Sequence, residues 1–156
     1  MRLIIRDIIP IIVLIIVLFM ILRVLYNNKH HKNYSLKDIY YLFYIIYFIF
    51  LFYVVTYDGL LDFNPEINLL LFREIFRYPV GSDLFFKNVL GNIIIFIPFG
   101  ILIKEEFNLN IFKTILISLI FSLSIEIVQL LIGRVFDIDD ILLNVIGSLI
   151  GYLLKK

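Results

Sequence analysis

The sequence predicts an all-α polytopic membrane protein with about five transmembrane helices. Of its 156 residues, 62% are hydrophobic and only 17% are charged, whereas soluble domains average about 45–50% apolar and about 25% charged residues. The mean hydropathy is +1.03. Several apolar runs approach the roughly 20 residues that a helix needs to cross a bilayer. We therefore expect a multi-pass protein whose first partner is the lipid bilayer.

Charge and cysteine content exclude several classes of function. With a net charge of +1, the chain is not strongly basic, as a nucleic-acid-binding protein is expected to be. The absence of cysteine excludes disulfides, thiol nucleophiles and thiolate metal sites.

The first 37 residues form an N-terminal transmembrane helix and a basic loop. The helix covers residues 3–26. No alanine and no small-residue cleavage site follow its apolar run, so we expect it to be retained rather than removed as a signal peptide. The loop at 27–37 carries His30 and His31, which are more simply solvated residues than metal ligands.

The remaining residues, 38–156, form a membrane domain that opens with a helix over about 39–57. A long connection follows, and its segment 67–78 is apolar but too short to span a bilayer. Because this segment also carries Arg73, Glu74 and Arg77, we expect a re-entrant or interfacial segment between the second and third helices.

Three further helices are predicted over about 86–103, 111–132 and 141–154. In the first, Pro98 and Gly100 predict a kink or a break. The next carries its polar residues at intervals of four, four, four and three, which places them on one face: Thr114, Ser118, Ser122, Glu126 and Gln129.

The last helix is expected to pack closely against a neighbour through its glycines. Gly147 and Gly151 are four residues apart and lie on one face, where they let another helix approach. Asp139 or Asp140 is expected to cap its first turn.

Polar residues from three helices are predicted to meet at one membrane face. The third helix starts, the fourth ends and the fifth starts on the same side, so the polar residues near those ends share one interface. The candidate ligand-binding residues are Asn88, Asn92, Glu126, Gln129, Arg134, Asp137, Asp140 and Asn144. With five spans and the amino terminus outside, eight of the 14 Lys and Arg residues are cytoplasmic and six are not, which places this pocket on the extracytoplasmic side.

The chemistry of this cluster leaves two interpretations open. Glu126 is a candidate general acid or base, Arg134 suits a phosphate or carboxylate, and Asp137, Asp139 and Asp140 are candidate ligands for a divalent cation. Alternatively, all the polar residues of this cluster have structural roles, with Glu126 paired to Arg134 and Gln129 hydrogen-bonded to Asn92 or Asn144. No cofactor is evident beyond that possible cation. No catalytic motif is recognisable, so we assign no catalytic residue and favour a non-enzymatic role.

Several short motifs together resemble the VanZ-like family of bacterial membrane proteins. They are Asn88-x-x-Gly91-Asn92, Phe96-Ile97-Pro98-Phe99-Gly100, Glu126-Ile127-Val128-Gln129, Gly133-Arg134-Val135-Phe136-Asp137-Ile138-Asp139-Asp140 and Asn144-x-x-Gly147. The resemblance covers roughly 67–154. One departure is Leu71, where the family commonly has proline before Phe72.

The resemblance implies a location in the bacterial cytoplasmic membrane and a role in the cell envelope. The family is named for a protein that confers low-level resistance to the glycopeptide teicoplanin. The implied partners are a cell-wall precursor, a lipid or a glycopeptide. The alternatives are a membrane enzyme acting on a lipid-linked or phosphate-bearing envelope precursor, and a small scaffold or transport subunit.

Overall fold

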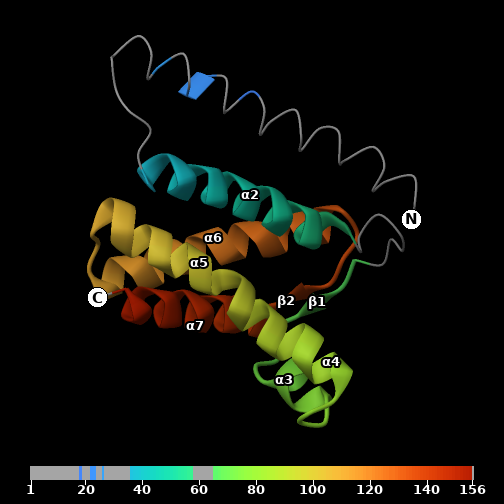
Figure 1. The fold of residues 1–156 in the computed structure, drawn as a ribbon. Coiled ribbons are helices and arrows are strands. Elements are labelled where there is room, and N and C mark those ends of the chain that lie inside the picture. Colours follow the sequence, from blue (N-terminus) through green and yellow to red (C-terminus); the bar gives the residue numbers. More distant parts are fainter. Residues whose placement is uncertain (1–17, 19–21, 24–25, 27–35, 58–64, 156) are drawn as a thin grey trace. The chain divides into compact units, whose positions relative to one another are not determined.

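Figure 1 shows the computed structural model of the chain, which describes residues 18, 22–23, 26, 36–57 and 65–155. The predicted first helix and the basic loop with His30 and His31 lie almost entirely outside the described residues. The chain divides into two compact units, residues 1–53 and 54–156, and each is considered by itself.

The helix predicted at 39–57 corresponds to α2, Leu36–Tyr57, most of which belongs to the first unit. Tyr44, Tyr47 and Leu51 are buried, and their spacing of three and four residues places them on one face. The other side chains from Tyr40 to Val54 are exposed or half-buried.

The second unit is built around three long helices. The first comprises α4 (Asp83–Phe85), the π-helical stretch η2 (Phe86–Leu90) and α5 (Gly91–Phe107), followed by α6 (Ile111–Leu131) and α7 (Ile138–Leu154). The first is continuous over 25 residues, and it and the 21-residue α6 are long and apolar enough to cross a membrane. Among the described residues these are the two helices that meet both criteria, so the total of about five spans stays a prediction.

The structure contradicts two local expectations about these helices, a break at Pro98 and a cap at Asp139 or Asp140. The long helix runs through Pro98 and Gly100 without a break, and its irregular stretch lies upstream, at η2. The cap of α7 is Asp137 rather than Asp139 or Asp140, since Asp137 has extended backbone and its Oδ1 accepts the N–H of Asp139 at 2.8 Å. The helix therefore begins three residues earlier than predicted.

A short parallel strand pair joins the segment before the long helix to the turn before α7. The all-α prediction did not include this pair. β1 (Ile67–Asn68) pairs with β2 (Phe136–Asp137), with Asn68 opposite Asp137. The interfacial segment predicted at 67–78 is thus β1, a turn and the five-residue helix α3 (Arg73–Arg77). Figure 1 shows α3 beside the start of the long helix, at the end of the unit where α7 begins.

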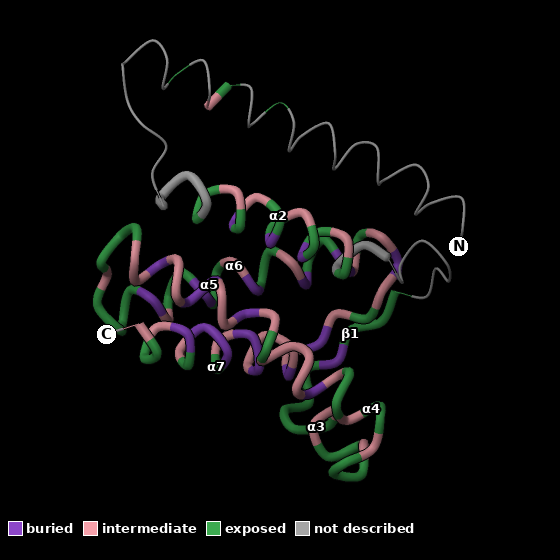
Figure 2. The backbone as a smooth tube through the Cα atoms, in the orientation of Figure 1, coloured by how far each residue is buried: buried purple, intermediate pink, exposed green. Residues whose placement is uncertain are grey.

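α5 and α7 touch through their backbones. A Cβ added to Gly147 would lie 2.1 Å from the carbonyl oxygen of Ile93, and one added to Gly100 would lie 1.9 Å from that of Ser148. Gly151 meets Ile97 O in the same way, at 2.0 Å. Figure 2 draws several stretches of α7 in purple as buried, and both glycines of this helix are buried.

Candidate functional site

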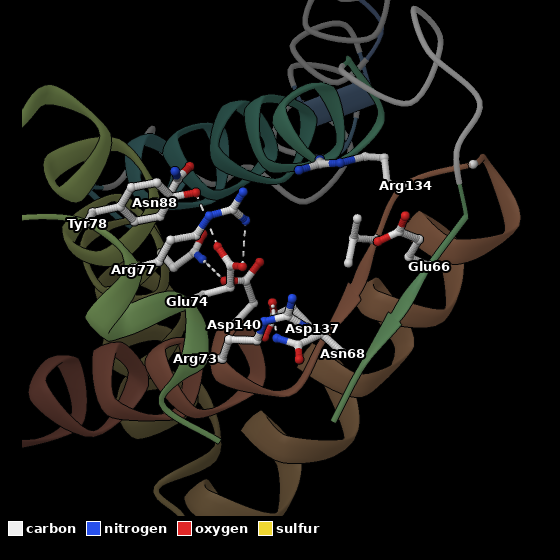
Figure 3. Close-up of a pocket in the computed structure, with 13 residues that line it drawn as sticks. Glu66, Asn68, Arg73, Glu74, Arg77, Tyr78, Asn88, Arg134, Asp137 and Asp140 are labelled. Carbon is white, nitrogen blue, oxygen red and sulfur yellow. Dashed lines mark hydrogen bonds and ion pairs between the residues drawn. The ribbon is translucent and has the colours of Figure 1, made fainter. Parts of the chain in front are cut away.

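A polar cavity of about 450 Å³ lies between β1, α3, the start of the long helix and the turn from α6 to α7. Figure 3 shows the side chains that surround it. Its lining residues are Glu66, Asn68, Arg73, Glu74, Arg77, Tyr78, Asn88, Asn92, Gly133, Arg134, Val135, Asp137 and Asp140. A cavity of this volume accommodates a small molecule or a headgroup.

Five of the eight residues predicted from the sequence line this cavity. They are Asn88, Asn92, Arg134, Asp137 and Asp140. The other three, Glu126, Gln129 and Asn144, are buried and are not among the lining residues. The predicted cluster therefore divides into a lining layer and a buried supporting layer.

Asp139 fixes the position of α3 from far along the chain. Its Oδ1 accepts the backbone N–H of Phe72 at 2.6 Å, and its Oδ2 accepts that of Glu74 at 2.9 Å. The side chain is fully buried. It satisfies the N–H groups that the first turn of any helix leaves without intrahelical partners, a role that the sequence analysis did not assign.

Asp137 joins three parts of the site. Its Oδ2 accepts a hydrogen bond from Asn68 Nδ2 at 2.9 Å, and its backbone N–H donates to Glu126 Oε2 at 2.9 Å. Burial raises the pKa of the Asp137 carboxyl above its usual range, although the amide of Asn68 and the N–H of Asp139 oppose the rise.

The other two central carboxylates in Figure 3 also accept hydrogen bonds. Asp140 Oδ1 accepts one from Asn92 Nδ2 at 2.6 Å. Glu74 pairs with Arg77 at 2.8 Å and accepts a hydrogen bond from the Tyr78 hydroxyl at 3.1 Å. These contacts tie α3 to its own loop and α7 to the long helix.

Gln129 bridges Glu126 and Arg134. In the amide orientation that satisfies both neighbours, Gln129 Nε2 lies 2.7 Å from Glu126 Oε1 and its Oε1 lies 2.9 Å from Arg134 Nη1. Glu126 is 1% exposed. The expected pairing of Gln129 with Asn92 or Asn144 is therefore replaced by a chain of polar contacts that ends at Arg134, in the cavity wall.

Asn144 belongs to the interface between α6 and α7. Its Nδ2 donates to Ser122 Oγ at 2.8 Å. The side chains of Thr114, Ser118 and Ser122 are completely buried on α6, so the polar stripe on this helix faces inward. Hydrogen bonds of this kind hold helices together within a bilayer.

The three aspartates do not converge on one point. Asp139 bonds backbone N–H groups, while Asp137 and Asp140 bond the amides of Asn68 and Asn92. In the part of the chain that the structure describes, no group of three His, Asp or Glu side chains is placed to hold a metal ion. A divalent cation at this loop stays a prediction without geometric support.

The sequence analysis missed the contribution of the segment before the long helix. Asn68, Arg73, Glu74, Arg77 and Tyr78 line the cavity, whereas the segment was assigned only to the membrane interface. The signal that could have indicated it is the density of charge at 73–77, within an otherwise apolar stretch.

Comparisons with known proteins agree with the sequence motifs. A family model described as VanZ/LLP1 matches residues 38–156. The chain is 32% identical to Protein VanZ of Enterococcus faecium over 110 residues, which cover 64% of this chain and 66% of that protein. The match thus spans just under two thirds of the relative's length. No solved structure matches the chain.

Proposed function

We propose, because this chain belongs to the VanZ/LLP1 family, that it is a multi-pass protein of the bacterial cytoplasmic membrane that lowers susceptibility to glycopeptide antibiotics such as teicoplanin. The observation that carries this proposal is the polar cavity, which combines arginines, carboxylates and amides at one end of two apolar helices. Such a cavity is a default candidate for ligand binding.

The proposed ligand is a cell-wall precursor, a lipid or the glycopeptide itself. Arg73, Arg77 and Arg134 offer forked donors that suit carboxylate or phosphate oxygens. Asn88 and Tyr78 add neutral polar groups for a peptide or sugar. A cavity that binds such a group would change how much antibiotic reaches its target at the membrane.

The geometry favours binding over catalysis. Glu126 was the candidate general acid or base, but it lies outside the cavity lining and accepts the backbone N–H of Asp137. We therefore assign Glu126 as a positioning residue that holds Asp137, while Arg134 contacts the ligand directly.

The orientation can be tested separately from the function. We propose that the cavity faces the extracytoplasmic side. Because the chain has no cysteine, Ser82→Cys at the start of the long helix and Asn110→Cys at the start of α6 can each carry a single label. A membrane-impermeant maleimide applied to whole cells should label Ser82→Cys alone. Labelling of Asn110→Cys alone would reverse the orientation.

The function is tested by expressing the chain in a teicoplanin-susceptible bacterium lacking relatives of this family. Wild type should raise the minimal inhibitory concentration several-fold, and Arg134→Ala should abolish the increase. Lys113→Ala, which removes a positive charge at the far end of α6, should leave the increase intact. Immunoblots of membrane fractions check that all three are present at equal levels. No protection by the wild type would refute the proposal.

A further inference from the structure

The arginines of the cavity differ in how they are bound. Arg77 is paired with Glu74 at 2.8 Å, and Arg134 lies 2.9 Å from Gln129 Oε1. Arg73 also lines the cavity, and its guanidinium makes no hydrogen bond or ion pair with the described residues. A planar group with five donors and no acceptor among the described residues is suited to an oxyanion from a ligand.

None of the four carboxylates that line the cavity forms a hydrogen bond or an ion pair with Arg73. Asp137 and Asp140 accept hydrogen bonds from asparagine side chains, and Glu74 binds Arg77 and Tyr78. Each of these three acids is therefore already engaged within the protein. The guanidinium of Arg73 therefore stays available to bind an anionic ligand.

The length of the long helix places the cavity near one surface of the bilayer. The 25-residue helix is about 37 Å long at roughly 1.5 Å per residue, so it exceeds a hydrocarbon core of about 30 Å. Asn88 and Asn92 fall about 8 and 14 Å from its first residue by the same rise. When the helix is centred on that core, about 4 Å of it extends beyond the core at each end, so Asn88 and Asn92 lie roughly 4 and 10 Å inside the boundary with the headgroups, in the outer third of the core.

The segment that contains α3 also exposes apolar side chains. Phe76 is 82% exposed and Val80 is 87% exposed, and Leu71 and Leu84 are also exposed. On the same short segment, Arg73 and Arg77 line the cavity. A segment with apolar and basic faces is typical of one that lies in the membrane interface, and it places lipid next to the cavity.

We infer that the cavity binds the anionic phosphate headgroup of a membrane lipid, with Arg73 as the direct ligand of the phosphate and with Arg77 and Arg134 beside it. This inference rests on the proposed function, because it names the ligand class of the same cavity. The lipid's acyl chains extend past Phe76 and Val80 into the bilayer, so the lipid enters laterally rather than from water.

The test is thermal unfolding of the full chain, purified in a neutral detergent, with three additives. Dioleoyl phosphatidylglycerol should raise the melting temperature in a saturable way, and dioleoyl phosphatidylcholine and inorganic phosphate should not. Equal stabilisation by inorganic phosphate would show that the cavity binds phosphate but does not require a lipid, which would overturn the assignment of a lipid ligand. Equal stabilisation by the two lipids, or by neither, would overturn the inference.

Arg73→Gln should weaken the apparent affinity for phosphatidylglycerol about tenfold or more, because it removes a charge-assisted hydrogen bond. Since Arg73 is exposed and has no partner among the described residues, its melting temperature without lipid should equal that of the wild type. Arg73→Lys should give an intermediate affinity, and Lys113→Gln controls for the loss of one positive charge. An unchanged affinity in Arg73→Gln would overturn the inference.

The inference and the proposed function fail in different ways. If phosphatidylglycerol has no selective effect while Arg134→Ala still abolishes teicoplanin protection, the function stands and the lipid assignment fails. If Arg73→Gln loses lipid selectivity but protects cells as well as the wild type, the lipid assignment stands and the resistance does not depend on it.

Discussion

Asn68 and Asp137 are joined by a hydrogen bond of 2.9 Å between side chains that lie 69 positions apart in the sequence. The same two residues are opposite each other in the parallel strand pair. Backbone and side-chain contacts thus hold the loop before the long helix against the turn after α6. The two walls of the cavity cannot separate without breaking both contacts.

Asp139→Asn should destabilise the protein by about 1–3 kcal/mol, because one of two buried acceptor oxygens becomes a donor facing a backbone N–H. The loss of stability should first affect α3, since the residue that precedes this helix provides no side-chain cap. Hydrogen exchange should therefore increase at 72–75 before it does so in α7. The exposed Asp83→Asn is the control, and equal protection at 72–75 in both variants would contradict the capping role.

Gly147→Ala should destabilise the protein by more than about 3 kcal/mol, because its Cβ would lie 2.1 Å from a backbone oxygen of α5. Gly91→Ala adds the same methyl group on the long helix, where the nearest atom is 3.5 Å away, and should be tolerated. Thermal unfolding in detergent compares the two. Equal melting temperatures would show that α5 and α7 are not in backbone contact.

Ser122→Ala should cost about 1–3 kcal/mol, because it leaves the buried Asn144 amide without the oxygen that accepts its hydrogen bond. Ser124→Ala is the matched control on the same helix, since its hydroxyl is exposed and bonds only Ile120 O in the preceding turn. Unfolding in detergent should separate the two variants. A larger effect of Ser124→Ala would contradict the inward direction of the polar stripe.

The Asp137 carboxyl should make stability depend on pH. Because burial raises its pKa in the folded state, the protonated form is favoured by folding. The contribution of this carboxyl to the free energy of unfolding is complete below its pKa in the unfolded chain, about 3.9. It is lost as the pH rises through its pKa in the folded protein. The Glu74 and Asp139 carboxylates lie near enough to raise this pKa, while Asn68 lowers it.

The corresponding measurement follows unfolding from pH 4 to pH 7 for the wild type and Asp137→Asn. The wild type should lose stability relative to the variant as the pH rises over this range. A difference between the two proteins that stays constant with pH would show that this carboxyl has its ordinary pKa.

The positions of the helices could be predicted because their apolar runs are long and their polar residues are periodic. The stripe from Thr114 to Glu126 is fully buried, as its spacing required. The cap of α7 was misplaced because three aspartates lie within four residues and each suits the first turn. Only the extended backbone at Asp137, set by the strand pair, selects one of them.

The loop side of the site could not be predicted because long-range contacts determine its structure. β1 has two residues, too few to show an alternating pattern, and it forms only opposite β2. The five-residue α3 is too short to be stable by itself and depends on Asp139. The charges of Arg73 and Arg77 were visible in the sequence, but their position beside Asn88 and Asp137 was not.

Because Asp139 caps α3, the order of synthesis determines when this part of the protein can fold. The carboxylate that holds the N-terminus of α3 is 67 positions beyond Phe72, so the ribosome completes the long helix and α6 before it is made. Until then, the α3 segment has no cap at its N-terminus. Truncation before Asp139 should therefore leave α6 inserted but the polar cavity unassembled, which would make the nascent chain a substrate for membrane-associated quality-control proteases.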